Sequence, residues 1–136
     1  MKVAVCLDDK NGMMFAKRRQ SKDRVLRQEF LNYIGEAKLW MNAYSARQFA
    51  EAKDRITVDE DFLQKAAEAD WCFVENADLR DAVEHITELA IYRWNRVYPS
   101  DQTFPEELFA PCWNLISRRD FAGNSHETIT EEIYTL

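Results

Sequence analysis

One stretch, from Trp71 to Pro105, constrains the fold of this chain more than any other. It opens with an apolar run, Trp71 to Val74, that lacks the alternation of polar and apolar residues typical of strands with one solvated face. A helical pattern that begins at Asp78 follows, and then a second strand-like run over residues 89–98. A buried strand, a short helix and another strand in this order predict a sheet covered on both faces.

The rest of the chain extends this pattern. Lys2 to Leu7 is a valine-rich run that predicts a strand, and Ser21 is the predicted N-cap of a helix that Gly35 ends. Two strand-like runs flank the turn at 123–126 and predict a hairpin. We therefore expect an α/β fold with a mixed, mostly parallel twisted sheet, helices on both faces and a C-terminal antiparallel hairpin. The expected strands cover residues 2–7, 38–42, 71–75, 88–98, 112–121 and 127–135, and the expected helices cover 22–34, 45–53, 59–69 and 77–86.

Composition limits the size, the binding partners and the cellular compartment that we expect for this protein. A chain of 136 residues is long enough for a single domain with a real core. Its formal net charge of -6 argues against a broad surface for nucleic acid or for an anionic membrane, and no apolar run approaches transmembrane length. The three cysteines, Cys6, Cys72 and Cys112, show no C-x-x-C spacing and indicate a reducing, cytoplasmic setting.

Several segments together resemble the dihydrofolate reductase family. Leu39-Trp-Met-Asn-Ala-Tyr-Ser45 is similar to the family's second strand and the start of the following helix. Thr57-Val-Asp-Glu60 resembles a Ser-Val-Asp-Glu segment that opens a helix in the family, and Trp71 to Pro105 aligns without gaps. Asn124-Ser125-His126 matches the final hairpin in place and type. The resemblance implies one shortened, dihydrofolate reductase-like domain over residues 1–136.

The chain departs from that family where the cofactor binds. The family carries a pair of glycines that let the backbone approach the pyrophosphate of NADPH, whereas Val74 and Glu75 stand in this position. The carboxylate of Glu75 would repel the phosphates. The stretch from Arg47 to Asp59 is also too short for the family's basic turn, its strand for the adenosine phosphate and the segment after it. We therefore predict no cofactor and, in particular, no binding of NADPH.

Two groups of polar residues are candidate binding sites. The first group follows the predicted strands at their carboxyl ends, where ligands bind in open α/β sheets: Asp8, Asp9, Asn42, Tyr44, Glu75 and Asn76. It would form an acidic crevice for a cation or a cationic ligand, although turns and helix caps use the same residue types. The second group is Lys17, Arg18, Arg19 and Ser21, which either bind an anion at a helix N-terminus or form a solvated basic loop.

No metal site is predicted. The only two histidines, His85 and His126, lack the spacing of metal ligands, and we expect both on the surface. P-loop and G-x-S-x-G motifs are absent from the sequence as well.

Two functions remain open at this point. The first is a non-catalytic dihydrofolate reductase-like domain that binds an unknown small molecule or a partner protein, or forms a homodimer through Trp94, Tyr98 or Trp40. Tyr92 and Trp94 share one face of a predicted strand, where they either form such an interface or pack in the core and at the sheet edge. The alternative is a divergent reductase-like enzyme acting on a small pterin-like or anionic substrate. The resemblance implies a proton donor on the first helix, so Asp23 and Glu29 are its candidates. A buried carboxyl with a raised pKa would favour the enzyme.

Overall fold

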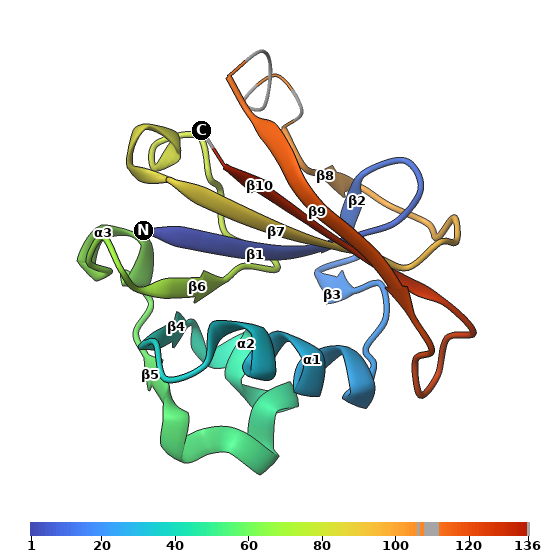
Figure 1. Ribbon diagram of the computed structural model, residues 1–136, viewed down its shortest axis with the longest axis horizontal. Helices are drawn as coiled ribbons and strands as arrows, with labels where there is room; N and C mark the ends of the chain where they lie inside the picture. Colours follow the sequence, from blue (N-terminus) through green and yellow to red (C-terminus); the bar gives the residue numbers. More distant parts are fainter. Residues whose placement is uncertain (106, 108–111, 136) are drawn as a thin grey trace.

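A seven-stranded sheet organises the molecule, and the computed structural model describes residues 1–105, 107 and 112–135 around it. The strand order is β5-β4-β6-β1-β7-β10-β9 (Figure 1). The bounds of these strands are β1 (Lys2–Leu7), β4 (Leu39–Met41), β5 (Ile56–Val58), β6 (Trp71–Phe73), β7 (Glu88–Arg93), β9 (Asn114–Phe121) and β10 (Ile129–Thr135). Neighbours from β5 to β7 pair in parallel, and β10 pairs antiparallel with both β7 and β9. The expected mixed sheet with a C-terminal hairpin is therefore confirmed.

Two layers of core cover the two faces of this sheet. Along β1, Val3, Val5 and Leu7 pack into one cluster, whereas Ala4 packs into the other, because successive side chains of a strand point to opposite faces. Trp71 to Val74 is buried throughout, as its sequence predicts.

Helix α1 (Arg24–Ile34) covers one face. Leu26, Phe30 and Ile34 recur every four residues and form its buried stripe. The Phe30 ring meets three aromatic rings of the sheet, including that of Trp71 at a centroid distance of 5.9 Å. Gly35, with a φ of 60°, ends the helix as predicted. The prediction that Ser21 caps it is wrong, because the cap is Asp23, two residues later.

The segment after β4 was predicted as one helix over 45–53. It forms α2 (Ala43–Ala46) and the 3₁₀ helix η1 (Arg47–Arg55), which is interrupted by non-helical backbone at Phe49 and Ala52. β5 then pairs with β4 at the sheet edge. A strand therefore does form between Arg47 and Asp59, although the sequence predicted none there.

The opposite face carries two helices that are much shorter than predicted. Residues 59–69 form only α3 (Phe62–Lys65), and residues 77–86 form only the 3₁₀ helix η2 (Val83–His85). Aspartate side chains accept hydrogen bonds from main-chain N–H groups nearby: Asp59 from Asp61, Asp70 from Ala67 and Asp78 from Arg80. Such local bonds compete with helical hydrogen bonding, which explains the shortening.

A second, three-stranded sheet lies beyond the carboxyl end of β1. Its strands are β3 (Arg18–Arg19), β2 (Gly12–Phe15) and β8 (Gln102–Thr103), in that order. The sequence indicated only the extended piece at 13–15. Ala16 and Lys17 join β2 to β3 with positive φ angles of 50° and 62°, which is the backbone of tight hairpin turns.

β7 is shorter than the predicted strand at 88–98. Asn95 has a φ of 59°, and its side chain donates to the Thr128 carbonyl oxygen and to the Thr130 hydroxyl, so the chain turns away. Tyr92 and Trp94 are only 0% and 4% exposed, and Trp40 is also buried. Tyr92 and Trp94 therefore pack in the core, as one of the two interpretations allowed, and the expectation that Trp94 or Trp40 lies in a dimer contact is wrong because both side chains are buried. Phe109, another aromatic residue of this region, lies outside the described residues.

Candidate functional site

The carboxyl ends of β4 and β6 bring four of the predicted site residues together. Asn42 donates from Nδ2 to Asn76 Oδ1 at 2.8 Å and also caps α2 through Ser45 N. Tyr44 lies one residue into α2, and Glu75 follows β6 and is 8% exposed. Neighbouring parallel strands explain this meeting, because their carboxyl ends share one edge.

Arg19 fills the space between these residues. Its Nε donates to Glu75 Oε2 at 2.8 Å, and one Nη donates to Glu75 Oε1 and to the Tyr44 carbonyl oxygen at 3.1 Å. The guanidinium lies 4.4 Å from the centre of the Tyr44 ring. Burial disfavours the charge on Arg19, but the hydrogen bond and charge of Glu75 outweigh it and raise the pKa of Arg19. The chain thus neutralises the acidic crevice with its own cation.

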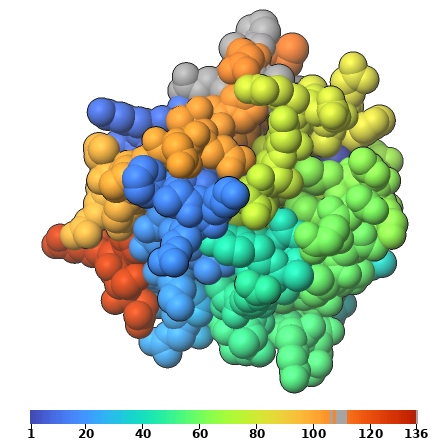
Figure 2. Space-filling view, turned by 180° about the vertical axis from the view of Figure 1, so that it is seen from behind, coloured from blue at the N-terminus to red at the C-terminus, as the bar shows by residue number. Residues whose placement is uncertain are grey.

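Figure 2 shows the position of the Arg19 segment from outside the molecule. The segment that carries Arg19 (blue) lies between the segments near residue 45 (cyan) and near residue 100 (orange) in Figure 2. β3 therefore covers the carboxyl ends of β4 and β6, where a ligand of an open α/β sheet would enter.

Asp8 and Asp9 do not join this crevice. Asp8 is buried and accepts hydrogen bonds from the N–H groups of Lys10, Gly12 and Tyr98 and from Gln20. Burial raises the pKa of Asp8, but these hydrogen bonds outweigh it and lower the pKa overall. Asp9 is exposed. Asp8 is thus placed as a turn residue, one of the two roles the sequence allowed.

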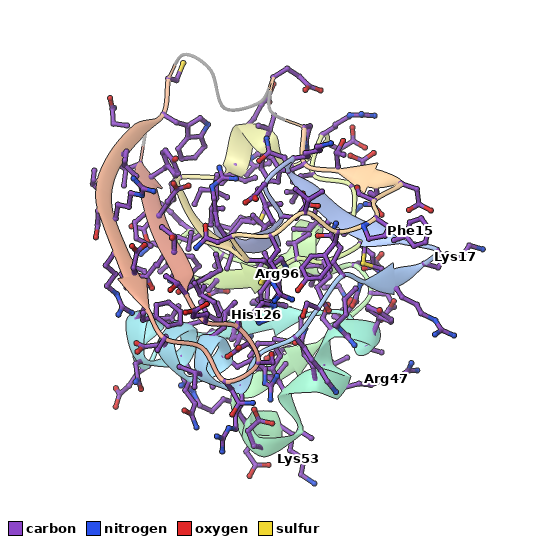
Figure 3. All side chains as sticks on the ribbon, turned by 90° about the vertical axis from the view of Figure 1, so that its right-hand side faces the viewer. Phe15, Lys17, Arg47, Lys53, Arg96 and His126 are labelled. Atoms are coloured by element: carbon purple, nitrogen blue, oxygen red, sulfur yellow. The ribbon has the colours of Figure 1, made fainter. Side chains whose placement is uncertain are left out.

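The four candidate anion-binding residues point to different places. Lys17 and Arg18 are exposed around the tip of the β2–β3 hairpin, beside Phe15, whose exposed fraction is 47%. Figure 3 shows Phe15 and Lys17 projecting outward there, well away from His126. Arg19 is paired with Glu75, and Ser21 contacts His126. The structure does not gather these residues around one anion.

His126 is the residue that the sequence interpretation missed. It was expected on the surface, yet it is 6% exposed and stacks on Trp94 with ring centroids 4.4 Å apart. Its Nδ1 lies 3.1 Å from Asp23 Oδ2, and its Nε2 lies 3.1 Å from Ser21 Oγ and 2.9 Å from the Tyr98 hydroxyl. The match of Asn124-Ser125-His126 to the family hairpin was the available signal. His85, by contrast, is exposed as predicted.

Asp23 anchors this group of residues. It caps α1 by accepting from Val25 N and Leu26 N, and it also accepts from Asn124 N and Ser125 N of the hairpin turn. Burial alone would raise the pKa of Asp23, but the hydrogen bonds hold it well below its usual range. Gly123 permits the close approach, since a Cβ there would lie 2.6 Å from Asp23 Oδ2. Asp23 is therefore ionised at neutral pH.

Comparison with known proteins rests on structure alone. The sequence matches no protein-family model and no curated protein. Among solved structures, the chain is similar to dihydrofolate reductase from Enterococcus faecalis complexed with NADP(H) and RAB-propyl, with a TM-score of 0.66 and 10% identity. The match covers 99% of this chain and 95% of that chain. This chain has the dihydrofolate reductase fold.

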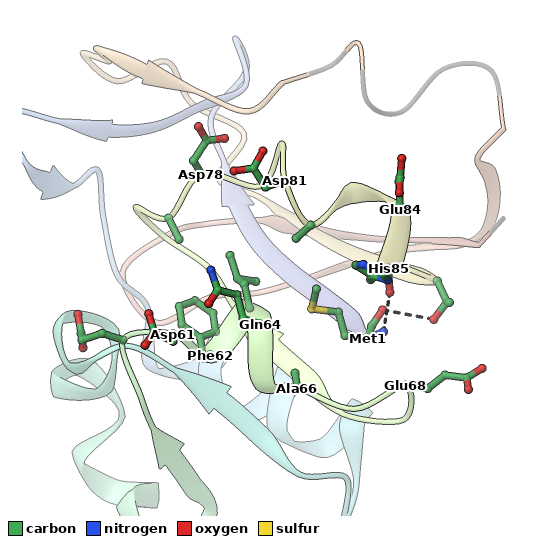
Figure 4. A pocket seen from close by; sticks show the side chains of 15 residues that line it. Met1, Asp61, Phe62, Gln64, Ala66, Glu68, Asp78, Asp81, Glu84 and His85 are labelled. Carbon is green, nitrogen blue, oxygen red and sulfur yellow. Dashed lines mark hydrogen bonds between the residues drawn. The ribbon is translucent and has the colours of Figure 1, made fainter.

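Within this dihydrofolate reductase-like chain, a groove of about 750 Å³ opens on the face that carries the shortened helices. α3 forms one wall and residues 77–87 form the other (Figure 4). Apolar side chains contribute to its lining: Met1, Phe62, Leu63, Ala66, Ala77 and Ala82. Six carboxylates also line it: Glu60, Asp61, Glu68, Asp78, Asp81 and Glu84. Among the described residues that line the groove, none is a lysine or an arginine.

No group of three or more His, Cys, Asp or Glu side chains in residues 1–105, 107 and 112–135 is arranged to hold a metal ion. Within the same part of the chain, no helix has the length and apolar character needed to cross a membrane.

Proposed function

We propose that this protein is a dihydrofolate reductase-like binding domain that has lost NADPH-dependent reduction. The carrying observation is that Arg19 occupies the crevice at the ends of β4 and β6, where it binds Glu75 and Tyr44. The resemblance locates the family's cofactor glycines at Val74 and Glu75. Val74 packs in the core, and the Arg19–Glu75 ion pair takes up the space that paired glycines would leave for a pyrophosphate. This arrangement supports a ligand site elsewhere on the domain. The three free cysteines suit a reducing, cytoplasmic compartment.

The enzyme alternative needs a proton donor on the first helix. Asp23 is buried, but its pKa is lowered rather than raised, and it accepts hydrogen bonds from several N–H groups. Glu29 forms an ion pair with Arg119 at 2.8 Å. Neither carboxylate is arranged to donate a proton to a pterin-like substrate, and this supports the binding domain over the reductase.

The groove between α3 and residues 77–87 is the site that we propose for the ligand. Its carboxylates lie along both walls (Figure 4), and one cation, the Met1 amine, is held at one end by the His85 carbonyl oxygen. Lys65 is adjacent but is paired with Asp59. A lining that combines acidic and apolar groups favours a basic segment with apolar side chains, of the kind that binds in helix-lined grooves.

Calorimetry with two probes tests this proposal. We expect a basic amphipathic peptide, with leucines at helical spacing and lysines at the other positions, to bind more tightly than spermine, because only the peptide carries apolar side chains for the groove. Replacing Asp78 and Asp81 by lysine should weaken both probes by about tenfold or more, and added salt should weaken the wild-type complexes.

The matched control is the Glu36→Lys, Glu127→Lys double variant, which changes the net charge equally at exposed positions outside the groove lining. It should retain most of the affinity. If both double variants lost the same affinity, net charge alone would explain the effect, and the groove would not be the binding site. Failure of the peptide and of spermine to bind the wild-type protein would also refute the proposal.

A further inference from the structure

Ser21, His126 and Asp23 form a continuous hydrogen-bonded series outside the crevice that Arg19 fills. Ser21 Oγ lies 3.1 Å from His126 Nε2, and His126 Nδ1 lies 3.1 Å from Asp23 Oδ2. We propose that Ser21 is a nucleophile, with His126 as its general base and Asp23 as the group that orients the base, in an acyl-transfer site. This order of groups and distances is that of the serine nucleophiles of hydrolases, which recur on unrelated folds.

The position of Asp23 determines which nitrogen of His126 carries the proton. An ionised carboxylate beside Nδ1 accepts a hydrogen bond, so Nδ1 bears the proton and Nε2 has a free lone pair. That lone pair faces Ser21 Oγ, as a general base for serine requires.

Asp23 and His126 are buried and held by several contacts, whereas the proposed nucleophile, Ser21, lies nearer the surface. The His126 ring stacks on Trp94 at an interplanar angle of 25°, and Asp23 is braced by the amides of α1 and of the hairpin turn. Asp23 and His126 are 2% and 6% exposed, whereas Ser21 is half-buried and lies at the surface end of the series. A buried base beside a reachable hydroxyl suits a site that reacts with molecules from solution.

The chemistry follows from this geometry for a carboxylic ester. The Ser21 O–H bond breaks, its proton moves to His126 Nε2, and the oxygen forms a bond to the ester carbonyl carbon, whose π electrons move to the carbonyl oxygen. When the C=O bond re-forms, the alcohol leaves with the proton from His126, and Ser21 carries the acyl group. Water then repeats the sequence, which releases the carboxylic acid and the free serine.

Tyr98 competes with Ser21 for the same lone pair. Its hydroxyl lies 2.9 Å from His126 Nε2, slightly closer than Ser21 Oγ. Removing the Tyr98 hydroxyl should therefore leave His126 to Ser21 alone and make the serine more reactive. If the network were purely structural, removing the Tyr98 hydroxyl would not make Ser21 more reactive, so this variant distinguishes the two cases.

The experiment uses a fluorophosphonate probe and locates the modified residue by mass spectrometry of the intact chain and its peptides. We expect one label, on Ser21. Ser21→Ala should abolish labelling, Tyr98→Phe should accelerate it, and His126→Gln should slow it by about 100-fold or more. Ser117→Ala, which removes an exposed hydroxyl on β9, should leave Ser21 labelled.

A second variant covers the case in which His126→Gln fails to fold. In Ser21→Cys, an oriented His126 should stabilise the thiolate, so that iodoacetamide alkylates residue 21 well below the usual cysteine pKa of about 8.5. Labelling at other residues, slower labelling in Tyr98→Phe, or an ordinary alkylation profile at residue 21 would each overturn the proposal.

Discussion

Asp23 links the start of α1 to the C-terminal hairpin, and its removal should be among the most destabilising single changes in the chain. It accepts hydrogen bonds from two helix amides, two turn amides and His126. Loss of a helix N-cap alone costs about 1 kcal/mol. Buried donors left without an acceptor cost about 1–3 kcal/mol each, although the exposed turn can recover part of this from water.

We therefore expect Asp23→Ala to lower the free energy of unfolding by about 4 kcal/mol, out of a typical total of about 5–15 kcal/mol. Asp23→Asn should cost about half as much, because the amide oxygen still caps the helix but carries no charge for the turn and His126. Urea denaturation with linear extrapolation measures both values. The control is Asp9→Ala, an exposed aspartate whose removal should change stability by less than about 0.5 kcal/mol.

The pH dependence of Asp23 has a definite sign. Its pKa is lowered in the folded protein, so the unfolded chain takes up its proton first as the pH falls. The stabilisation is therefore complete above the unfolded pKa of about 3.9 and is lost below it. In Asp23→Asn, stability should fall less steeply in this acidic range. A loss below about 1 kcal/mol for Asp23→Ala, or an unchanged acid profile in Asp23→Asn, would refute this account.

Three further predictions concern the cofactor, the core and association. NADPH should give no saturable heat of binding at concentrations up to about 1 mM, and the Val74→Gly, Glu75→Gly double variant should not restore tight binding; micromolar affinity in the wild-type chain would contradict this. Tyr92→Phe should cost about 1–3 kcal/mol, because the buried phenol donates to Glu131 at 2.8 Å. Burial and the charge of Glu131 raise the pKa of Tyr92, so this stabilisation should be lost as the pH rises above the unfolded value of about 10, and the variant's alkaline profile should be flatter. The homodimer stays a prediction: light scattering at micromolar concentrations should give twice the chain mass of 16.1 kDa, through surfaces other than the buried Trp40 and Trp94.

The sequence alone was sufficient for the fold class and for the elements that depend on local patterns. The unbroken apolar run from Trp71 to Val74 predicts a strand covered on both faces, and the four-residue spacing of Leu26, Phe30 and Ile34 predicts α1. Both signals are local, because the periodicity of an element follows from its own backbone geometry. The hairpin followed in the same way from two runs around a polar turn.

The two helices predicted on the other face are shorter than expected because local hydrogen bonds compete with helix formation. Asp59, Asp70 and Asp78 bind nearby main-chain amides, and apolar spacing does not show whether an aspartate will cap a helix or interrupt it. The groove of about 750 Å³ lies between these shortened elements and was therefore not predictable.

The two candidate sites depended on tertiary structure for a different reason. Arg19 and Glu75 are 56 residues apart, and His126 is 103 residues from Asp23. The sequence identified Glu75 and Arg19 as members of opposite candidate sites, and it indicated a surface position for His126. Only the folded chain places β3 over the end of β6 and the hairpin turn against the start of α1. Charge pairing and burial are properties of such long-range neighbours, and no local pattern in the sequence encodes them.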